Sequence, residues 1–254
     1  MNLATQPWIP VTDLSGAAQR VSLREVFTKG RELADFSVRP HERIALMRLL
    51  LCIAHRALQG PKDSAALERA ADELPDAAAA YLDDKADCFD LFDPVKPFLQ
   101  FPGLAKPPKP AGKKAKKADS AEDEEEEGTA ASKLDFALAT GNNPTLFDNQ
   151  AATELPRVFE PADLALMLIT FQCFSPGGRI GVALWNGKET PGKGSSGHAP
   201  CSPSAMLHAF LRGKNVLETI TANLVTEATV RQNYGKSFGH PVWEKFPASF
   251  QDQD

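Results

Sequence analysis

The sequence predicts an α+β fold with a mostly helical body, a small antiparallel sheet and long irregular loops. Several segments repeat apolar residues at three- and four-residue steps, which is the period of an amphipathic helix. Short segments of alternating polarity near the N-terminus are typical of strands. Residues 174–203 contain seven Gly and four Pro, a composition that excludes a packed helix there. Helices should therefore outnumber strands.

Composition places the chain among globular proteins. It has 254 residues, of which 43% are hydrophobic, and a net charge of -5. The longest apolar run is interrupted by Arg48 and His55, so we expect no membrane span. The N-terminus lacks a basic stretch followed by an apolar one, so we expect no secretory signal and a cytoplasmic location. The four cysteines are scattered without metal-ligand spacing, so we expect no metal site and no cofactor.

The first hundred residues contain most of the predicted regular elements. Strands are expected at Trp8–Val11 and Ala18–Ser22, and an extended segment at Leu33–Val38. Between them, Ser22 with Glu25 three residues later is the capping-box pattern that opens a short helix. Pro40 suits a helix start, and an apolar period of three- and four-residue steps runs from Ile44 to Leu58.

Proline shapes the next segments. Two further helices are predicted, Asp63–Leu74 and Asp76–Ala86, separated at Pro75 because proline lacks the amide donor of a helix interior. Residues 89–101 are rich in Phe and Pro, which favours an irregular segment packed over the core.

Residues 105–132 differ in composition from the rest of the chain. Six Lys are followed by an acidic run from Glu122 to Glu127, with no aromatic residue and no apolar period. Such a segment buries too little apolar surface to offset its ordering entropy, so we expect a disordered charged insertion.

The second half alternates loops with short elements. A loop is predicted at residues 138–150 and a helix from Pro161 through Phe171. Strands at 180–185 and 206–211 are expected to join the N-terminal sheet, followed by a helix at 216–224 and an extended aromatic segment at 238–246.

Charge is uneven, and this bears on nucleic-acid binding. Residues 170–250 carry eight basic against four acidic side chains within an acidic chain. In this region Gly177, Gly178 and Arg179 form a candidate DNA-binding loop, because glycine lets a backbone approach phosphates or base edges and arginine adds charge. The residues alone favour the alternative, in which the two glycines end the preceding helix.

Two other local patterns suggest chemistry. Phe147 with Asp148 and Asn149 could stack on a base or enter a partner, although an aromatic that anchors its own loop fits as well. His198 and Cys201 form the nearest arrangement of a base and a thiol nucleophile, which leaves a stand-alone thiol enzyme as an alternative.

Several motifs together resemble one family. They are N-L-x-x-x-x-W-I-P-V from Asn2, P-F-L-Q at Pro97–Gln100, T-G-N-N-P-T-L-F-D-N at 140–149, S-P-G-G-R at 175–179, F-L-R-G-x-x-V-L-E-T-I-T-A-N-L at 210–224 and G-H-P-V-W-E at 239–244. In this order they resemble the N-terminal portion of CasA, the large subunit of the type I-E CRISPR surveillance complex, Cascade. The likeness covers the chain except residues 105–132.

The resemblance implies a function without catalysis. It implies a subunit that recognises a protospacer-adjacent motif in double-stranded DNA, helps to start unwinding and recruits a separate helicase-nuclease. The guide RNA reads the target sequence by pairing, as in RNA-guided recognition generally. The implied partners are the other Cascade subunits, the guide RNA, the DNA target and the helicase-nuclease.

The resemblance also assigns residues. Asn142, Asn143, Phe147, Asp148 and Asn149 match the family loop that docks near the guide RNA and the neighbouring subunit. The glycines of the S-P-G-G-R motif match the start of the loop that approaches the DNA motif from the minor groove, while a DNA contact by its arginine is our own hypothesis.

Two departures from the family accompany these assignments. The zinc-binding cysteine pairs of some relatives have no counterpart at 155–161. The hairpin that completes motif recognition and the C-terminal helical bundle do not fit within this length, so we expect residues 1–254 to be the N-terminal domain of a larger subunit. A purely structural scaffold remains a further alternative.

Overall fold

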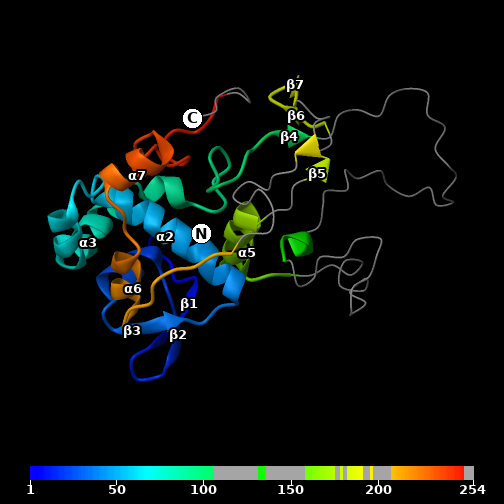
Figure 1. Cartoon of the computed structure of the whole chain (residues 1–254). Helices are drawn as coiled ribbons and strands as arrows, with labels where there is room; N and C mark the ends of the chain where they lie inside the picture. The colour runs from blue at the N-terminus through cyan, green and yellow to red at the C-terminus, as the bar shows by residue number, and fades with distance from the viewer. Residues whose placement is uncertain are drawn as a thin grey trace, which may run out of the picture.

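The structure is a computed structural model of the chain and describes residues 1–105, 131–135, 158–174, 178–179, 182–190, 195–196 and 207–248. Figure 1 shows a body around the long helix α2 (Pro40–Ala57), with helix α3 (Ser64–Asp84) on one side and α5 (Pro161–Phe174) on the other. A small sheet lies below α2 in this view. The α+β class with a mostly helical body is confirmed.

The N-terminal sheet has three antiparallel strands in the order β2-β1-β3. They are β1 (Ile9–Asp13), β2 (Ala18–Val21) and β3 (Leu33–Phe36), with Ile9 opposite Val21 and Val11 opposite Phe36. Helix α1 (Leu23–Thr28) follows β2. Its predicted capping box is present: the Glu25 amide donates to Ser22 Oγ at 3.2 Å, and the Ser22 amide donates to Glu25 Oε2 at 2.9 Å.

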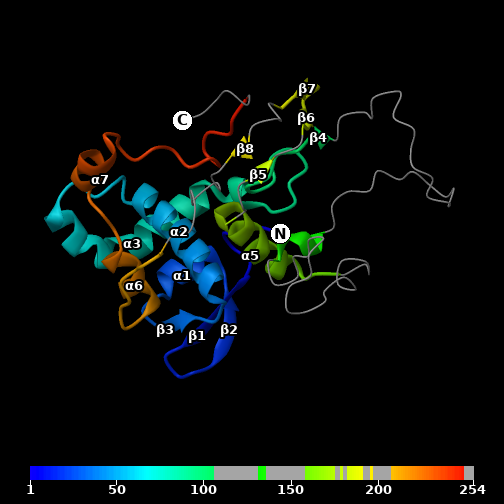
Figure 2. The same cartoon turned by 45° about the vertical axis from the view of Figure 1, so that its right-hand side comes forward.

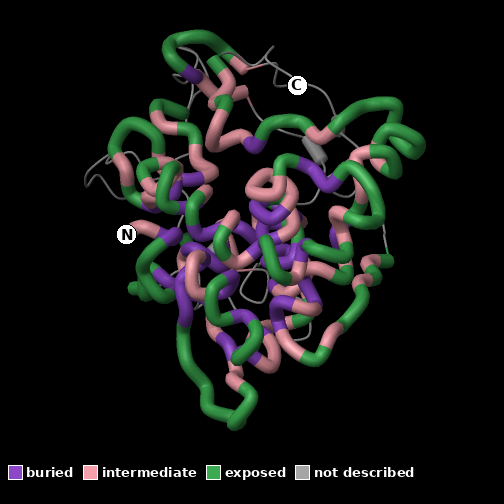
Figure 3. The backbone as a smooth tube through the Cα atoms, turned by 90° about the vertical axis from the view of Figure 1, so that its left-hand side faces the viewer, coloured by how far each residue is buried: buried purple, intermediate pink, exposed green. Residues whose placement is uncertain are grey.

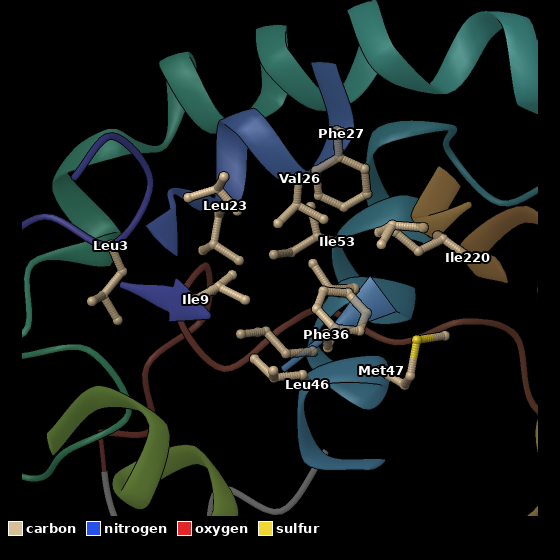
Figure 4. Packing of buried hydrophobic residues seen from close by; sticks show 14 of the residues in the cluster. Leu3, Ile9, Leu23, Val26, Phe27, Phe36, Leu46, Met47, Ile53 and Ile220 are labelled. Atoms are coloured by element: carbon tan, nitrogen blue, oxygen red, sulfur yellow. The ribbon is translucent and has the colours of Figure 1, made fainter. Parts of the chain in front are cut away.

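The core forms where α2 meets this sheet and α1. Figure 4 shows side chains from both layers pointing into one space, among them Ile9, Phe27, Leu46 and Ile53, all of which are fully buried. The predicted period of α2 accounts for its buried face, and Pro40 is its first residue. Figure 3 shows that buried residues gather in the middle of the body and exposed ones follow the outer loops.

Helix α3 corrects one prediction, because it runs through Pro75 as a single helix. Proline at this position removes the amide that would bond the carbonyl of Ala71. Arg31 supplies the missing donor: its Nη2 lies 2.8 Å from that carbonyl and 2.8 Å from Asp72 Oδ1. A side chain from elsewhere in the sequence thus satisfies the group that proline leaves free.

The Phe- and Pro-rich segment is irregular and packed on the core, as predicted. It begins with the 3-10 helix η1 (Ala86–Phe89), and the buried rings of Phe89 and Phe98 stack with centroids 5.1 Å apart. Phe92 and Val95 are exposed on its outer side.

The predicted helix at 216–224 is confirmed as α6 (Val216–Ala222), whereas α7 (Glu227–Tyr234) was not predicted. The predicted strand at 206–211 is wrong for residues 207–211, which form no strand. Instead, the Leu211 amide donates to Asn223 Oδ1 at 2.8 Å, and Asn223 Nδ2 donates to the Leu211 carbonyl at 2.7 Å. One amide side chain therefore satisfies groups that a neighbouring strand would have paired.

The prediction of one sheet is also wrong. A second sheet has the order β4-β6-β7, from β4 (Leu104–Ala105), β6 (Leu184–Trp185) and β7 (Lys188–Glu189). Asn186 and Gly187 both have positive φ, which folds β6 back onto β7 in a two-residue hairpin, and β6 pairs with β4 on its other edge rather than with an N-terminal strand.

The charged insertion predicted at 105–132 lies mostly outside the described residues. At its edges Ala105 ends β4, and Ala131 and Ser132 begin the 3-10 helix η2 (Ala131–Leu134). Among the described helices, none has the length and apolarity to cross a bilayer.

Candidate nucleic-acid interface

The glycine-rich region follows α5, which packs along α2 and ends at Phe174. Strand β5 (Gly178–Arg179) pairs antiparallel with β8 (Ser195–Ser196), so that Gly178 lies opposite Ser196 and Arg179 opposite Ser195. Figure 2 shows this pair and the β4-β6-β7 sheet together at one end of the molecule, beyond α5. The pairing joins two glycine-rich stretches that are separate in the sequence.

The structure places only part of the predicted DNA-binding loop. Gly178 and Arg179 are strand residues, and Gly178 comes four positions after the last residue of α5. Gly178 therefore does not end that helix, which removes the simpler explanation for this glycine. Gly177 lies outside the described residues. Small residues on both strands allow another backbone to approach closely.

The other sequence-predicted site residues are not described. Asn142, Asn143, Phe147, Asp148 and Asn149 all lie within residues 136–157, which are outside the described part. His198 and Cys201 lie outside it as well, so the thiol-enzyme alternative is not tested by their geometry.

The described part of the chain has no group of three His, Cys, Asp or Glu side chains that could hold a metal ion. Two of its three thiols, Cys52 and Cys88, do not favour nucleophilic chemistry either. The surrounding protein raises the pKa of Cys52 to about 11, chiefly through burial, with Glu244 adding to the effect and Arg56 opposing it, and burial raises the pKa of Cys88. Both thiols are therefore protonated at neutral pH and are poor nucleophiles.

A polar cluster that the sequence does not predict anchors residues 237–246, which we call the C-terminal strap. Glu244 is nearly buried and accepts from Arg56 at 2.7 Å and from the Tyr81 hydroxyl at 2.7 Å. The Trp243 indole donates to the same hydroxyl at 2.7 Å. The strap thus bonds to both α2 and α3. The G-H-P-V-W-E motif contains half of this cluster, but nothing in the sequence pairs it with Arg56 and Tyr81.

The electrostatics of this cluster follow from its burial and hydrogen bonds. Burial opposes ionisation of the Glu244 carboxyl, but the bonds from Arg56 and Tyr81 outweigh it and hold its pKa below the ordinary value. Burial also raises the pKa of Tyr81, so this phenol stays protonated and can donate. Directly before Arg56 in α2, burial lowers the pKa of His55 to about 4, so its imidazole is neutral.

Trp243 also has an apolar environment. Its ring centroid lies 5.5 Å from that of Phe89 and 5.8 Å from that of Phe98. Trp243 also lines a cleft of about 400 Å³, together with other aromatic rings and the polar side chains of Asp87, Lys96, Gln172 and Glu244. The strap therefore packs on the Phe-rich segment through Trp243.

Known proteins resemble the chain over nearly its whole length. The family model of the CRISPR-associated protein Cse1 matches residues 2–254. The chain belongs to the Cse1 (CasA) family. A curated relative, CasA/Cse1 of Thermus thermophilus, is 34% identical over 99% of this chain and 43% of its own length. The resemblance inferred from the sequence motifs is thereby confirmed.

Solved structures of Cse1 proteins share the fold. Cse1 of Acidimicrobium ferrooxidans is 27% identical with a TM-score of 0.66, over 98% of this chain and 43% of its own. CasA of Thermus thermophilus is 29% identical with a TM-score of 0.63, over 96% and 42%. A chain of a CRISPR RNA-guided surveillance complex has a TM-score of 0.70 at 19% identity, over 98% and 47%, which shows the shared fold alone. This chain spans less than half the length of these Cse1 relatives.

Proposed function

We propose that the chain acts as a DNA-recognition subunit of a type I-E CRISPR surveillance complex, without catalytic activity of its own. In this role it binds the other Cascade subunits and the guide RNA. It helps to recognise the protospacer-adjacent motif in double-stranded DNA, to start unwinding and to recruit the helicase-nuclease.

The match of the Cse1 family model to residues 2–254 carries this proposal. The Cse1-like fold of a chain in an RNA-guided surveillance complex supports it. The raised pKa values of Cys52 and Cys88, two of the three cysteines that the structure describes, are consistent with an absence of catalysis by these thiols.

The arrangement beyond α5 supports a DNA contact in particular. Gly178 and Arg179 pair with Ser195 and Ser196 of β8 at one end of the molecule. This pairing places a glycine backbone directly beside a cationic residue. Backbone amides and arginine are the groups that proteins use to contact DNA phosphates and base edges. The acidic net charge is compatible with this role if neighbouring subunits supply most phosphate contacts.

Electrophoretic titration of motif-bearing duplex with the reconstituted complex tests the DNA contact. We expect Arg179→Ala to weaken binding about tenfold, since one charged contact to DNA contributes on the order of 1 to 3 kcal/mol. The control is Arg69→Ala, which removes the same charge from an exposed ion pair on α3. This control should bind like the wild type.

Three outcomes would contradict parts of the proposal. Unchanged binding with Arg179→Ala would reject the arginine contact. A complex whose affinity for motif-bearing DNA is the same with and without this chain would identify a scaffold. An enzymatic activity of the isolated chain that is lost on thiol alkylation would identify the enzyme that uses His198 and Cys201.

A further inference from the structure

A cleft of about 550 Å³ separates the C-terminal turns of α2 from the first half of the strap. One wall comes from α2 and the residues directly after it, from Arg48 to Gly60, and the other from residues 237–241. Clefts of this volume hold small organic ligands in other proteins.

The charge of the cleft is positive and uncompensated. Arg56 is neutralised by Glu244, and Glu227 by Arg231. Arg48 is exposed in the same cleft and has no ion-pair partner among the residues that the structure describes. An arginine without a carboxylate in a concave site favours an oxyanion ligand, because its planar fork matches phosphate and carboxylate groups.

Other hydrogen-bond donors line the same cleft. The Gln59 amide and the Ser237 hydroxyl both face it, and no side-chain partner is found for either within the described part of the chain. Together with Arg48 they provide several hydrogen-bond donors. A carboxylate has only two acceptor oxygens, whereas a phosphate group has three strong ones, so this set of donors favours phosphate over carboxylate.

His55 gives a second, independent indication of a missing partner. Its Nε2 accepts from the Val225 amide at 3.3 Å, so the neutral ring has its hydrogen on Nδ1. That Nδ1 is the one buried side-chain polar atom without a hydrogen bond among the described residues. A buried donor without an acceptor is costly and calls for an explanation. The Phe238 ring packs edge-on against this imidazole, with the two ring centroids 4.5 Å apart.

Most of the remaining lining is apolar, apart from His240, whose Nδ1 lies 3.6 Å from Glu244 Oε2. Leu51 and Pro241 contribute to this lining together with Phe238, which is half-buried. Gly60 permits this seating of Phe238: a Cβ at Gly60 would lie 2.9 Å from Phe238 Cδ2, and its φ is +72°. A ring and leucine beside an unpaired arginine suit a ligand with a flat apolar part and an anionic group.

We propose that this cleft binds a phosphate monoester carried on a planar ring, of which a nucleoside monophosphate is the simplest example. Arg48 holds the phosphate, with Gln59 and Ser237 as further donors, while the ring packs against Phe238 and Leu51. The proposal is independent of DNA recognition beyond α5, since it uses none of those residues.

Isothermal titration of the full chain with AMP tests this site, with adenosine and inorganic phosphate as separate arms. We expect AMP to bind with a dissociation constant below about 1 mM. Adenosine alone and phosphate alone should each bind at least about tenfold more weakly. Arg48→Gln should weaken AMP at least about tenfold, the loss expected for one charge-assisted hydrogen bond. Arg48 is exposed, so this variant should fold normally.

Lys96→Gln is the matched control, because it removes one exposed cation from the other cleft. It should bind AMP like the wild type. Amide NMR then locates the ligand: the signals of Gly60 and Gly239 should shift with the same dissociation constant as the titration. The proposal is overturned if AMP does not saturate, if Arg48→Gln binds as well as Lys96→Gln, or if only signals remote from the cleft shift.

Discussion

The body and the C-terminal strap are both attached to α2, but by different forces. The body is held by apolar burial, with side chains such as Trp8 and Phe27 fully removed from solvent. The strap has no regular structure over residues 237–241 and is fixed by Glu244, which bonds to Arg56 and Tyr81. One helix therefore supports a core on one side and a polar anchor on the other.

The difference predicts how each region responds to substitution. Apolar burial is spread over many side chains, and each large one contributes several kcal/mol through the area and volume it fills. A polar anchor concentrates its effect in few atoms, whose loss leaves groups without partners. Substitutions in the body should therefore lower the stability of the whole fold, and those in the strap should act mainly on the strap.

The largest expected effect is in the body. Trp8 is fully buried, and its indole Nε1 donates to the carbonyl of Leu3 at 2.9 Å. Trp8→Ala would leave a cavity and remove one of the two hydrogen bonds to this carbonyl, to which the Leu23 amide also donates, so we expect a loss of about 3 to 5 kcal/mol in the free energy of unfolding. Urea denaturation followed by circular dichroism measures it.

Trp185 offers the matched control for Trp8. It too is nearly buried, but it lies in the small β4-β6-β7 sheet, where its ring meets that of Phe101 edge-on at 5.5 Å. Trp185→Ala should cost about 1 to 2 kcal/mol, since the surrounding sheet is short and can adjust. Equal losses for the two tryptophans would mean that the body is not the main source of stability.

The strap should show a smaller effect of a different kind. Glu244→Gln removes the charge that Arg56 and Tyr81 face, and we expect a loss of about 1 to 2 kcal/mol because Arg56 is only partly buried and can be solvated. The same variant should increase amide hydrogen exchange in the strap more than in α2. Mass spectrometry of exchanged peptides separates the two.

The pH dependence sharpens this test. The pKa of Glu244 in the folded chain is below its ordinary value of 4.5, so its stabilising effect is complete above pH 4.5 and is lost as the pH falls through the lowered pKa. The difference between wild type and Glu244→Gln should shrink in that range. Glu73→Gln, which breaks an exposed ion pair on α3, is the control and should change stability by less than about 0.5 kcal/mol at any pH. If Glu73→Gln lowered the free energy of unfolding as much as Glu244→Gln does, the role of Glu244 as a buried anchor of the strap would be contradicted.

The sequence predicts those elements whose signal is local. The capping box at Ser22 and Glu25, the proline start of α2 and the period of α6 depend on residues within a few positions, and all are confirmed. Sheet membership depends on distant pairing, so β4 and β8 were not found and the strand at 206–211 was predicted wrongly.

The candidate sites follow the same division. The S-P-G-G-R motif identifies a glycine-rich segment, but its pairing with Ser195 and Ser196 is a long-range contact that no spacing reveals. Arg48 looks like an interruption of an apolar run in the sequence. Only the fold shows that this arginine faces a cleft and that its carboxylate-bearing neighbours are already paired.

The smallest expected effect concerns a polar contact within the body. Arg31 is exposed yet donates to the Ala71 carbonyl that Pro75 leaves without its helical donor. Arg31→Met should cost about 0.5 to 1 kcal/mol, since a solvent-exposed carbonyl can bond to water once the guanidinium is gone.

A double-mutant cycle decides whether Pro75 explains this contact. In a Pro75→Ala background the new amide at position 75 can bond to the Ala71 carbonyl, so removing the Arg31 side chain should cost measurably less than in the wild type. Urea denaturation of the four proteins gives the coupling. An identical cost in both backgrounds would assign the effect of Arg31 to its ion pair with Asp72 alone. In that case packing alone would allow α3 to contain a proline. Polar contacts would then contribute even less to the stability of the body, in contrast to the strap, which a polar anchor fixes.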